Sequence, residues 1–147
     1  MMKKIMMTLL AAVMCIGMAS ARDTYSRNAA DLPAAARSFI SNNFKAKVSL
    51  IKIDKGLIEG TDYDVVLSDG SEVDFDSKGN WESIEVPAGK SVPAKVIPEM
   101  TSRYIKQNHP GQKVVGIERE HNGFSIELAN GIEFKTDRTG TFKKYDD

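Results

Sequence analysis

Cysteine is nearly absent from the 147-residue chain, with Cys15 as its only representative. Because Cys15 lies in an apolar N-terminal run, the rest of the chain can form no disulfide and must derive its stability from a packed core. Histidine is also scarce, since the chain contains only His109 and His121, and they do not form a ligand-spaced pair. These absences argue against a disulfide scaffold and against a thiolate or histidine metal centre.

Motifs that carry chemistry are missing as well. The sequence contains no Gly-x-Ser-x-Gly elbow and no cofactor-binding loop. Lysine plus arginine equal aspartate plus glutamate, 20 against 20, without the clustered basic face that nucleic acid binding requires. We therefore expect no catalytic residue, no cofactor, no metal and no nucleic acid partner, and we do not expect an enzyme.

The N-terminus has the pattern of a secretory signal. Lys3 and Lys4 precede an apolar run, Ile5–Met18, and Ala19–Ala21 form an A-x-A cleavage site. The run of about 14 residues is shorter than the roughly 20 that span a bilayer. The sequence predicts a signal peptide over 1–21 that is cut after Ala21, a periplasmic or secreted protein without a membrane span, and a flexible leader over 22–30.

The remaining chain contains the same pattern twice. Residues 63–70 align with residues 124–131 at a spacing of 61, and this alignment continues to Trp81, which matches Phe142. Upstream, residues 32–34 match residues 92–94 at a spacing of 60, and Phe44 then matches Tyr104. The sequence predicts a single domain, 31–147, made of two repeats, 31–86 and 91–147.

Each repeat is expected to begin with a helix. Apolar residues at helical spacing form one stripe in each copy: Leu32, Ala36, Phe39, Ile40 and Phe44, and then Val92, Val96, Ile97, Met100 and Tyr104. Pro98 lies inside the second stripe, so it should kink that helix or delay its start.

Strands should follow each helix. Tyr63, Val65 and Leu67 alternate with mostly polar residues, as do Phe124, Ile126 and Leu128, which is typical of half-buried strands. Asp-Gly and Asn-Gly pairs between the strands are strong hairpin signals. We predict an α+β fold of two tandem helix-plus-four-strand repeats, with about eight strands in one antiparallel sheet and both helices packed on one face.

These motifs resemble the PepSY-like family, whose members are also described as β-lactamase-inhibitor-protein-like. The resemblance rests on the helix starts Leu32-Pro33 and Val92-Pro93, on Tyr63-x-Val65-x-Leu67-x-Asp69-Gly70 and on Asp76-x-x-Gly79-x-Trp81. It covers residues 31–147 and implies two αβ₄ units side by side in an extracytoplasmic protein. Related PepSY domains in protease propeptides are thought to bind or inhibit proteases, but no inhibitory residue pattern is shared.

One segment resembles a calcium loop. Asp74, Asp76 and Glu85 occupy positions 1, 3 and 12, and Gly79 occupies position 6. Lys78 stands at position 5, where an oxygen ligand belongs, and the flanks are strand-like. These features favour a hairpin turn with solvated acids.

The remaining candidate surface is the sheet face that the helices leave open. By alternation, this face should carry a group of acids, and Trp81 is either a core residue or a contact residue on the same face. The candidate binding residues are Asp62, Asp64, Glu72, Asp74, Asp76 and Trp81. Residues 31–86 hold 11 acidic and six basic side chains, a net charge of −5, whereas residues 87–147 hold eight and 10, a net charge of +2.

We therefore expect a non-catalytic extracytoplasmic binding module, such as a protein-binding or protease/hydrolase-inhibitor-like protein. Its partner would be an extracytoplasmic protein or peptide, and the protein itself would be a monomer or weakly self-associating. The alternative is an ion-binding or small-ligand-binding protein that uses the acidic sheet face.

Overall fold

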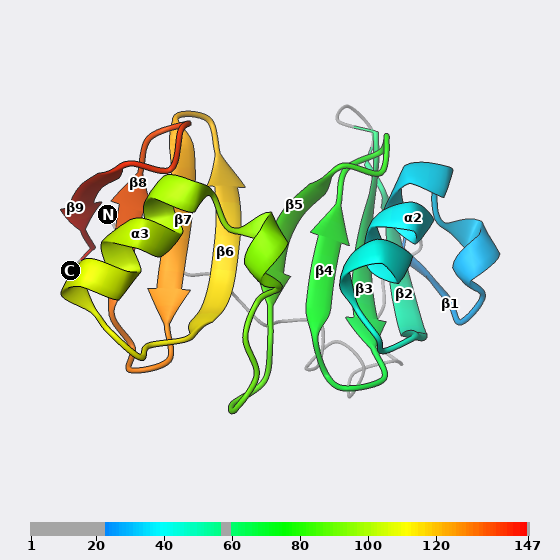
Figure 1. The fold of residues 1–147 in the computed structure, drawn as a ribbon. Helices are drawn as coiled ribbons and strands as arrows, with labels where there is room; N and C mark the ends of the chain where they lie inside the picture. Colours follow the sequence, from blue (N-terminus) through cyan, green and yellow to red (C-terminus); the bar gives the residue numbers. More distant parts are fainter. Residues whose placement is uncertain (1–22, 57–59, 147) are drawn as a thin grey trace. The chain divides into compact units, whose positions relative to one another are not determined.

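The computed structural model of the chain describes residues 23–56 and 60–146, so the predicted signal peptide lies outside the described residues. The first half contains β1 (Asp23–Ser26), the 3₁₀ turn η2 (Ala29–Asp31), α2 (Ala34–Asn43), β2 (Val48–Lys55), β3 (Thr61–Leu67), β4 (Glu72–Phe75) and β5 (Trp81–Glu85). The second half contains η3 (Ala94–Val96), α3 (Glu99–Asn108), β6 (Val114–Glu120), β7 (Gly123–Leu128), β8 (Glu133–Thr136) and β9 (Phe142–Tyr145) (Figure 1).

The strands form one antiparallel sheet of nine strands, in the order β1 to β9. Every strand neighbours the one before it in the sequence, which is the topology that short hairpin turns produce. The α+β prediction is confirmed, and four strands follow each helix. The ninth strand, β1, comes from the segment that the sequence analysis treated as a leader.

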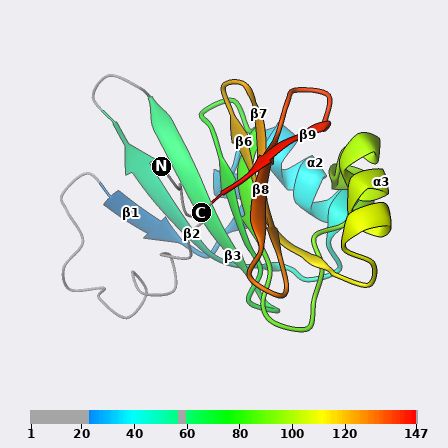
Figure 2. The same ribbon diagram turned by 90° about the vertical axis from the view of Figure 1, so that its left-hand side faces the viewer.

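The chain divides into two compact units with a boundary between Glu82 and Ser83, inside β5. We call the described residues 23–82 the first unit and residues 83–146 the second unit. Each unit contains one helix that packs on one face of that unit's strands (Figure 2). No helix in the described ranges is long and apolar enough to cross a membrane.

Each core is built on a row of apolar side chains that lie opposite one another on neighbouring strands. In the first unit, Ile51 of β2 pairs with Val65 of β3, which pairs with Val73 of β4. All three side chains are fully buried. The second unit repeats the arrangement with a row of equally buried residues: Ile117, Ile126 and Phe134. Apolar burial of this kind contributes about 25 cal/mol per Å² to stability.

Both helices begin directly after a proline. Pro33 is the N-cap of α2 and Pro98 is the N-cap of α3. The second half of the proline prediction is therefore correct, because Pro98 delays the helix rather than kinking it. Ile97 has an extended backbone, with φ −80° and ψ 127°, as expected for a residue that precedes proline.

The sequence alignment of the two helices is wrong by five residues. The helices start at Ala34 and Glu99, which gives a spacing of 65 and not 60. Phe44 is the C-cap of α2, whereas Tyr104 lies in the middle of α3, so the two do not correspond. The Pro-Ala dipeptide at residues 93–94 misled the alignment, because it begins the turn η3 rather than the helix.

The leader prediction is also wrong for the described residues 23–30. Asp23–Ser26 form β1, which pairs with β2 through Asp23–Asp54, Thr24–Ile53, Tyr25–Lys52 and Ser26–Ile51. Asn28 then caps η2, because its Oδ1 accepts a hydrogen bond from the Ala30 backbone N–H at 3.0 Å. A four-residue strand has too few residues to show alternation. It forms because the backbone of β2 offers it hydrogen-bonding partners.

Candidate functional site

The register confirms that the predicted acids of β3 and β4 lie on the face opposite the core. Tyr63 pairs with Phe75 and Val65 with Val73 on the core side, so the residues between them point the other way. Asp64 lies directly opposite Asp74. Glu72 belongs to the same face, as does Asp62, which lies opposite Asp54 of β2.

Asp64 has a strongly perturbed environment on this face. Burial raises the pKa of the Asp64 carboxyl, and the nearby charges of Asp62 and Asp54 act in the same direction. A hydrogen bond with Asp74 and the positive charge of Lys52 act against that rise. Asp64 and Asp74 therefore behave as a cross-strand pair of acids that shares a hydrogen bond.

The face also contains a cation, so it is less acidic than its acids alone suggest. Lys52 lies opposite both Asp64 and Tyr25 on the neighbouring strands. Its Nζ is 3.6 Å from Asp23 Oδ2, and both side chains are mostly shielded from solvent. The predicted acidic surface is thus a row in which one lysine neutralises part of the carboxylate charge.

Asp76 belongs to a turn and not to this row. Its Oδ1 accepts hydrogen bonds from the backbone N–H groups of Lys78 and Asn80, both at 2.9 Å, and its Oδ2 accepts one from Asn80 Nδ2 at 3.2 Å. Desolvation raises the pKa of Asp76, but these hydrogen bonds outweigh it and hold the pKa below its usual value. Its oxygens stabilise the turn.

The calcium-loop pattern does not form an ion site in the described residues. Asp76 directs its oxygens at backbone N–H groups, and no cluster of three or more acidic, histidine or cysteine side chains in the described ranges is placed to hold a metal. Asp137 plays the same turn role in the second unit, accepting from Thr139 N and Thr141 N at 2.9 and 3.0 Å. The shared Asp-x-x-Gly spacing therefore reflects turn geometry.

Trp81 is a core residue and does not line the open face. It is only 7% exposed, and its ring stacks on Phe39 of α2 with centroids 6.2 Å apart. Ile84, three residues further on, is fully buried as well, so strict alternation does not hold across residues 81–84. Of the two alternatives for Trp81, the core position is therefore the one that the structure confirms.

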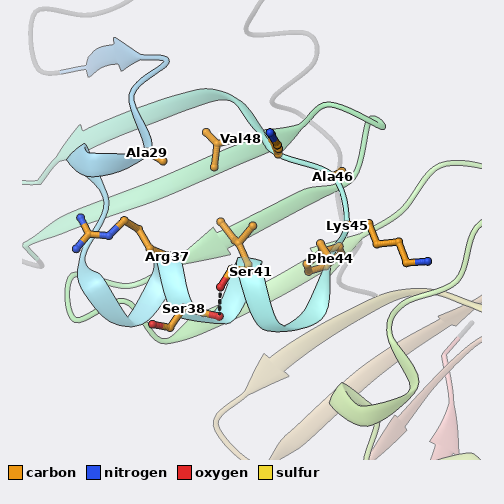
Figure 3. Close-up of a pocket in the computed structure, with 10 residues that line it drawn as sticks. Ala29, Arg37, Ser38, Ser41, Phe44, Lys45, Ala46 and Val48 are labelled. Carbon is orange, nitrogen blue, oxygen red and sulfur yellow. Dashed lines mark hydrogen bonds between the residues drawn. The ribbon is translucent and has the colours of Figure 1, made fainter.

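A groove in the first unit lies between α2 and β2 (Figure 3). Its volume is about 700 Å³, within the range of ligand sites. Its apolar surface comes mainly from Ala29, Ile40, Phe44, Ala46 and Val48, and its polar surface from Arg37, Ser38, Ser41, Lys45 and Lys47. We call this surface the α2 groove.

The polar side chains of the α2 groove include three cations and no acid. The Arg37 guanidinium donates from Nη1 to the carbonyl oxygens of Ala30 and Leu32, at 3.1 and 3.2 Å, which holds it at the edge of the groove. Lys45 and Lys47 are exposed and follow the end of α2. The groove therefore combines an apolar floor with a positive rim.

The corresponding region of the second unit differs in charge. With the helix spacing of 65, Ser102 replaces Arg37 and Pro110 replaces Lys45. Lys47 corresponds to Lys113, because their carbonyls accept from Ser68 N and Ala129 N in the same way. Lys113 Nζ donates to Gly89 O at 3.0 Å, so its charge is already engaged. The arrangement of Arg37, Lys45 and Lys47 is therefore not repeated in the second unit, where Arg103 and Lys106 instead stand at the positions of Ser38 and Ser41.

A second, smaller pocket of about 470 Å³ lies in the second unit and includes Glu120, His121, Lys135 and Lys144. Lys135 Nζ contacts both Glu120 oxygens, at 2.7 and 2.9 Å, and lies 3.9 Å from Asp146 Oδ2. Desolvation lowers the pKa of Lys135, but its acidic neighbours outweigh this and raise it. Within this pocket, Lys135 and Glu120 therefore neutralise one another.

Sequence reasoning missed the α2 groove entirely. Its residues come from η2, α2 and the segment before β2, and none of them forms a motif. The only available signal was the pair Lys45 and Lys47 directly after the predicted helix, which becomes meaningful once the alignment is corrected.

The fold and the turn pattern point to one family. The family profile described as "Putative beta-lactamase-inhibitor-like, PepSY-like" matches residues 61–144. The chain belongs to the PepSY-like family. The profile covers β3 to β9, which include both Asp-x-x-Gly turns. A search among curated proteins found no match for this PepSY-like chain.

Solved structures of related chains extend over most of the protein. A "putative periplasmic protein of unknown function" from Bacteroides vulgatus is 44% identical, with a TM-score of 0.80, over 85% of this chain and 99% of that one. A "putative calcium-regulated periplasmic protein" from Bacteroides thetaiotaomicron is 32% identical, with a TM-score of 0.77, over 85% and 97%. A third, from the DUF2874 family of Bacteroides vulgatus, is 28% identical, with a TM-score of 0.77, over 88% and 100%.

Proposed function

We propose that this PepSY-like chain is a non-catalytic binding module that works outside the cytoplasm and holds a segment of a partner protein in the α2 groove. The observation that carries the proposal is the groove itself, with its apolar floor and its three rim cations. Apolar clefts with a few placed polar groups are the usual form of a binding site.

Two further observations support the compartment and the lack of catalysis. The N-terminal residues 1–21 have the pattern of a secretory signal, and the solved relatives are described as periplasmic. The family description is inhibitor-like, and inhibition needs binding but no chemistry of its own. The charged residues described above form turns and ion pairs rather than a nucleophile–base pair.

Isotope-labelled protein titrated with extended peptides tests this proposal by NMR. Amide shift changes should concentrate at α2 and at the start of β2, and saturate with increasing peptide. A Ser41→Trp variant, which places a large ring in the groove, should abolish them. Gln107→Trp, at an exposed position of α3, is the matched control and should bind normally.

Two outcomes would count against the proposal. If no peptide in a varied panel shifts any amide, the chain is not a peptide-binding module of this kind. If the shifts instead map to β3 and β4 and persist in Ser41→Trp, the binding surface is the open sheet face.

The acidic row provides a second candidate, an ion-binding or small-ligand-binding face. It is favoured by one observation, the direct cross-strand pairing of Asp64 with Asp74. Like charges directly opposite one another destabilise a sheet, so a bound cation would relieve them. A cation that binds only the folded state raises the melting temperature. Millimolar calcium should then stabilise the protein but not its Asp64→Asn variant, and an unchanged melting curve would eliminate this candidate.

A further inference from the structure

We infer that the α2 groove recognises an acidic peptide strand, in which an apolar side chain stands between two carboxylates. This inference rests on the proposed function and specifies the chemistry of the partner. It is carried by the floor of the groove, by the unneutralised charge on its rim and by the spacing of that charge along α2.

The floor suits one apolar side chain. Ile40 is 5% exposed and anchors the helix side, while Phe44 and Val48 are half-buried and leave part of their surface accessible. Phe44 also packs on Phe39, with ring centroids 6.3 Å apart, and Phe39 stacks on Trp81. The floor is therefore tied to the core, and a ligand side chain gains apolar burial without having to order it.

The rim of the groove favours a negatively charged ligand. The Arg37 guanidinium has five N–H donors, and its hydrogen bonds to Ala30 and Leu32 use only Nη1, so the group can still meet a carboxylate. The ammonium groups of Lys45 and Lys47 have no hydrogen bond or ion pair within the described part of the chain. Three cations without an acid among the lining residues form a surface that attracts anions and disfavours basic partners.

The positions of the cations favour a peptide over a single-headed amphiphile such as a fatty acid. Arg37 lies six residues before the end of α2 at Asn43, which is about 9 Å of helix rise, and Lys45 lies beyond that end. Figure 3 shows Arg37 and Lys45 at opposite ends of the groove, with Val48 between them.

An extended chain spans such a groove naturally. Residues i, i+2 and i+4 of a strand lie on one side, and four residues cover about 13 Å. An acidic–x–apolar–x–acidic strand would therefore place one carboxylate near Arg37, its apolar side chain on the floor and the second carboxylate near the lysines. A fatty acid has only one anionic group and would leave one end of the rim unpaired.

Fluorescence anisotropy with three labelled peptides tests this inference. The peptides share one length and one central leucine, and carry glutamate, glutamine or lysine on both sides of it, two residues away. The glutamate peptide should bind at least tenfold more tightly than the glutamine peptide, and the lysine peptide should not bind. Raising the salt concentration from 50 to 500 mM should weaken the glutamate peptide more than the glutamine peptide.

Matched protein variants separate rim charge from overall charge. Lys45→Glu/Lys47→Glu should weaken the glutamate peptide about tenfold or more and leave the glutamine peptide unchanged. Lys55→Glu/Lys106→Glu makes the same change in net charge at exposed sites outside the groove, and should bind as the parent protein does. Circular dichroism of each variant shows whether it is folded.

The outcomes distinguish this inference from the proposed function. Equal affinity for the glutamate and glutamine peptides, lost in Ser41→Trp, would overturn the acidic specificity but keep the groove as a peptide site. If sodium laurate binds below its micelle concentration and no peptide displaces it, the peptide assignment is overturned in favour of an amphiphile. If neither a peptide nor laurate binds in the groove, both this inference and the proposed function are overturned.

Discussion

Phe39 of α2 stacks on Trp81 of β5, with ring centroids 6.2 Å apart and ring planes inclined by 29°. The second unit contains the same relationship between Tyr104 and Phe142, at 4.4 Å and 7°. The helix residues are 65 positions apart and the strand residues 61, so a helix-to-strand aromatic pair recurs although the spacing is not constant. The pair attaches α2 to β5 in the first unit and α3 to β9 in the second unit.

Removing the indole of Trp81 should strongly destabilise the protein. Trp81→Ala should lower the free energy of unfolding by about 3–5 kcal/mol in urea titration, since large-to-small core changes lose burial and leave a cavity. A double-mutant cycle with Phe39→Ala should give a coupling of about 0.5–1.5 kcal/mol for the stacked pair. A cost below about 1 kcal/mol would show that Trp81 is solvated.

Gly140 should tolerate a methyl group far less than Gly131 does. Both have positive φ angles, 88° and 90°, so both pay the strain of about 1–2 kcal/mol that a side chain suffers there. A Cβ at Gly140 would clash with Pro98 Cβ and lie 2.8 Å from Thr101 Oγ1, whereas a Cβ at Gly131 would have no neighbouring heavy atom within 4 Å. Chemical denaturation should show Gly140→Ala to be at least 2 kcal/mol more costly than Gly131→Ala, and equal costs would contradict the close helix approach.

Asp64 should make the protein less stable as the pH rises. Burial raises the pKa of Asp64 above its usual 3.8, so the folded state holds the proton more tightly than the unfolded state. The resulting stability is fully present below pH 3.8 and is lost as the pH rises through the folded pKa. Asp64→Asn should therefore stabilise the protein progressively more between pH 4 and pH 7, as measured by urea midpoints.

Asp54→Asn controls for the loss of one carboxylate from the neighbouring row of the same face. If Asp64→Asn is instead less stable than the parent protein at pH 7, and increasingly so as the pH rises, the attraction of Asp64 to Lys52 outweighs the cost of its burial.

Tyr104 should ionise at an unusually high pH for a phenol. Desolvation and the hydrogen bond with the Tyr145 hydroxyl raise the pKa of Tyr104 to about 12. Tyr145→Phe removes that hydrogen bond and should shift the Tyr104 phenolate transition to lower pH in an ultraviolet titration. Tyr25→Phe, in the other unit, should remove one tyrosine signal and leave the Tyr104 transition in place.

His109 connects to the same pair of phenols, since its Nε2 lies 2.9 Å from the Tyr145 hydroxyl. This contact joins the end of α3 to the last strand, β9, which also contributes Phe142 to the aromatic cluster. No local pattern in the sequence pairs His109 with Tyr145, which lies 36 positions later.

Local patterns were enough to predict most of the fold. Alternation placed Val65 and Val73 in the core and Asp64 and Asp74 on the opposite face, because side-chain direction in a strand follows from position alone. Turn chemistry was equally local, since the Asp76 side chain hydrogen-bonds its own turn. These features need no information from distant residues.

Features that depend on distant contacts were predicted wrongly, left open or missed. The strand β1 exists because β2 offers it hydrogen bonds, and Trp81 is buried because Phe39 covers it. The α2 groove requires η2, α2 and the segment before β2 to be brought together, and no sequence motif records that meeting. The sequence by itself determined the α+β class, the hairpin turns and which strand residues face the core, because each depends on neighbours a few positions away. Only the tertiary structure decided which helix residue faces which strand, and thereby where a positive groove is left open, because packing and not spacing sets those contacts.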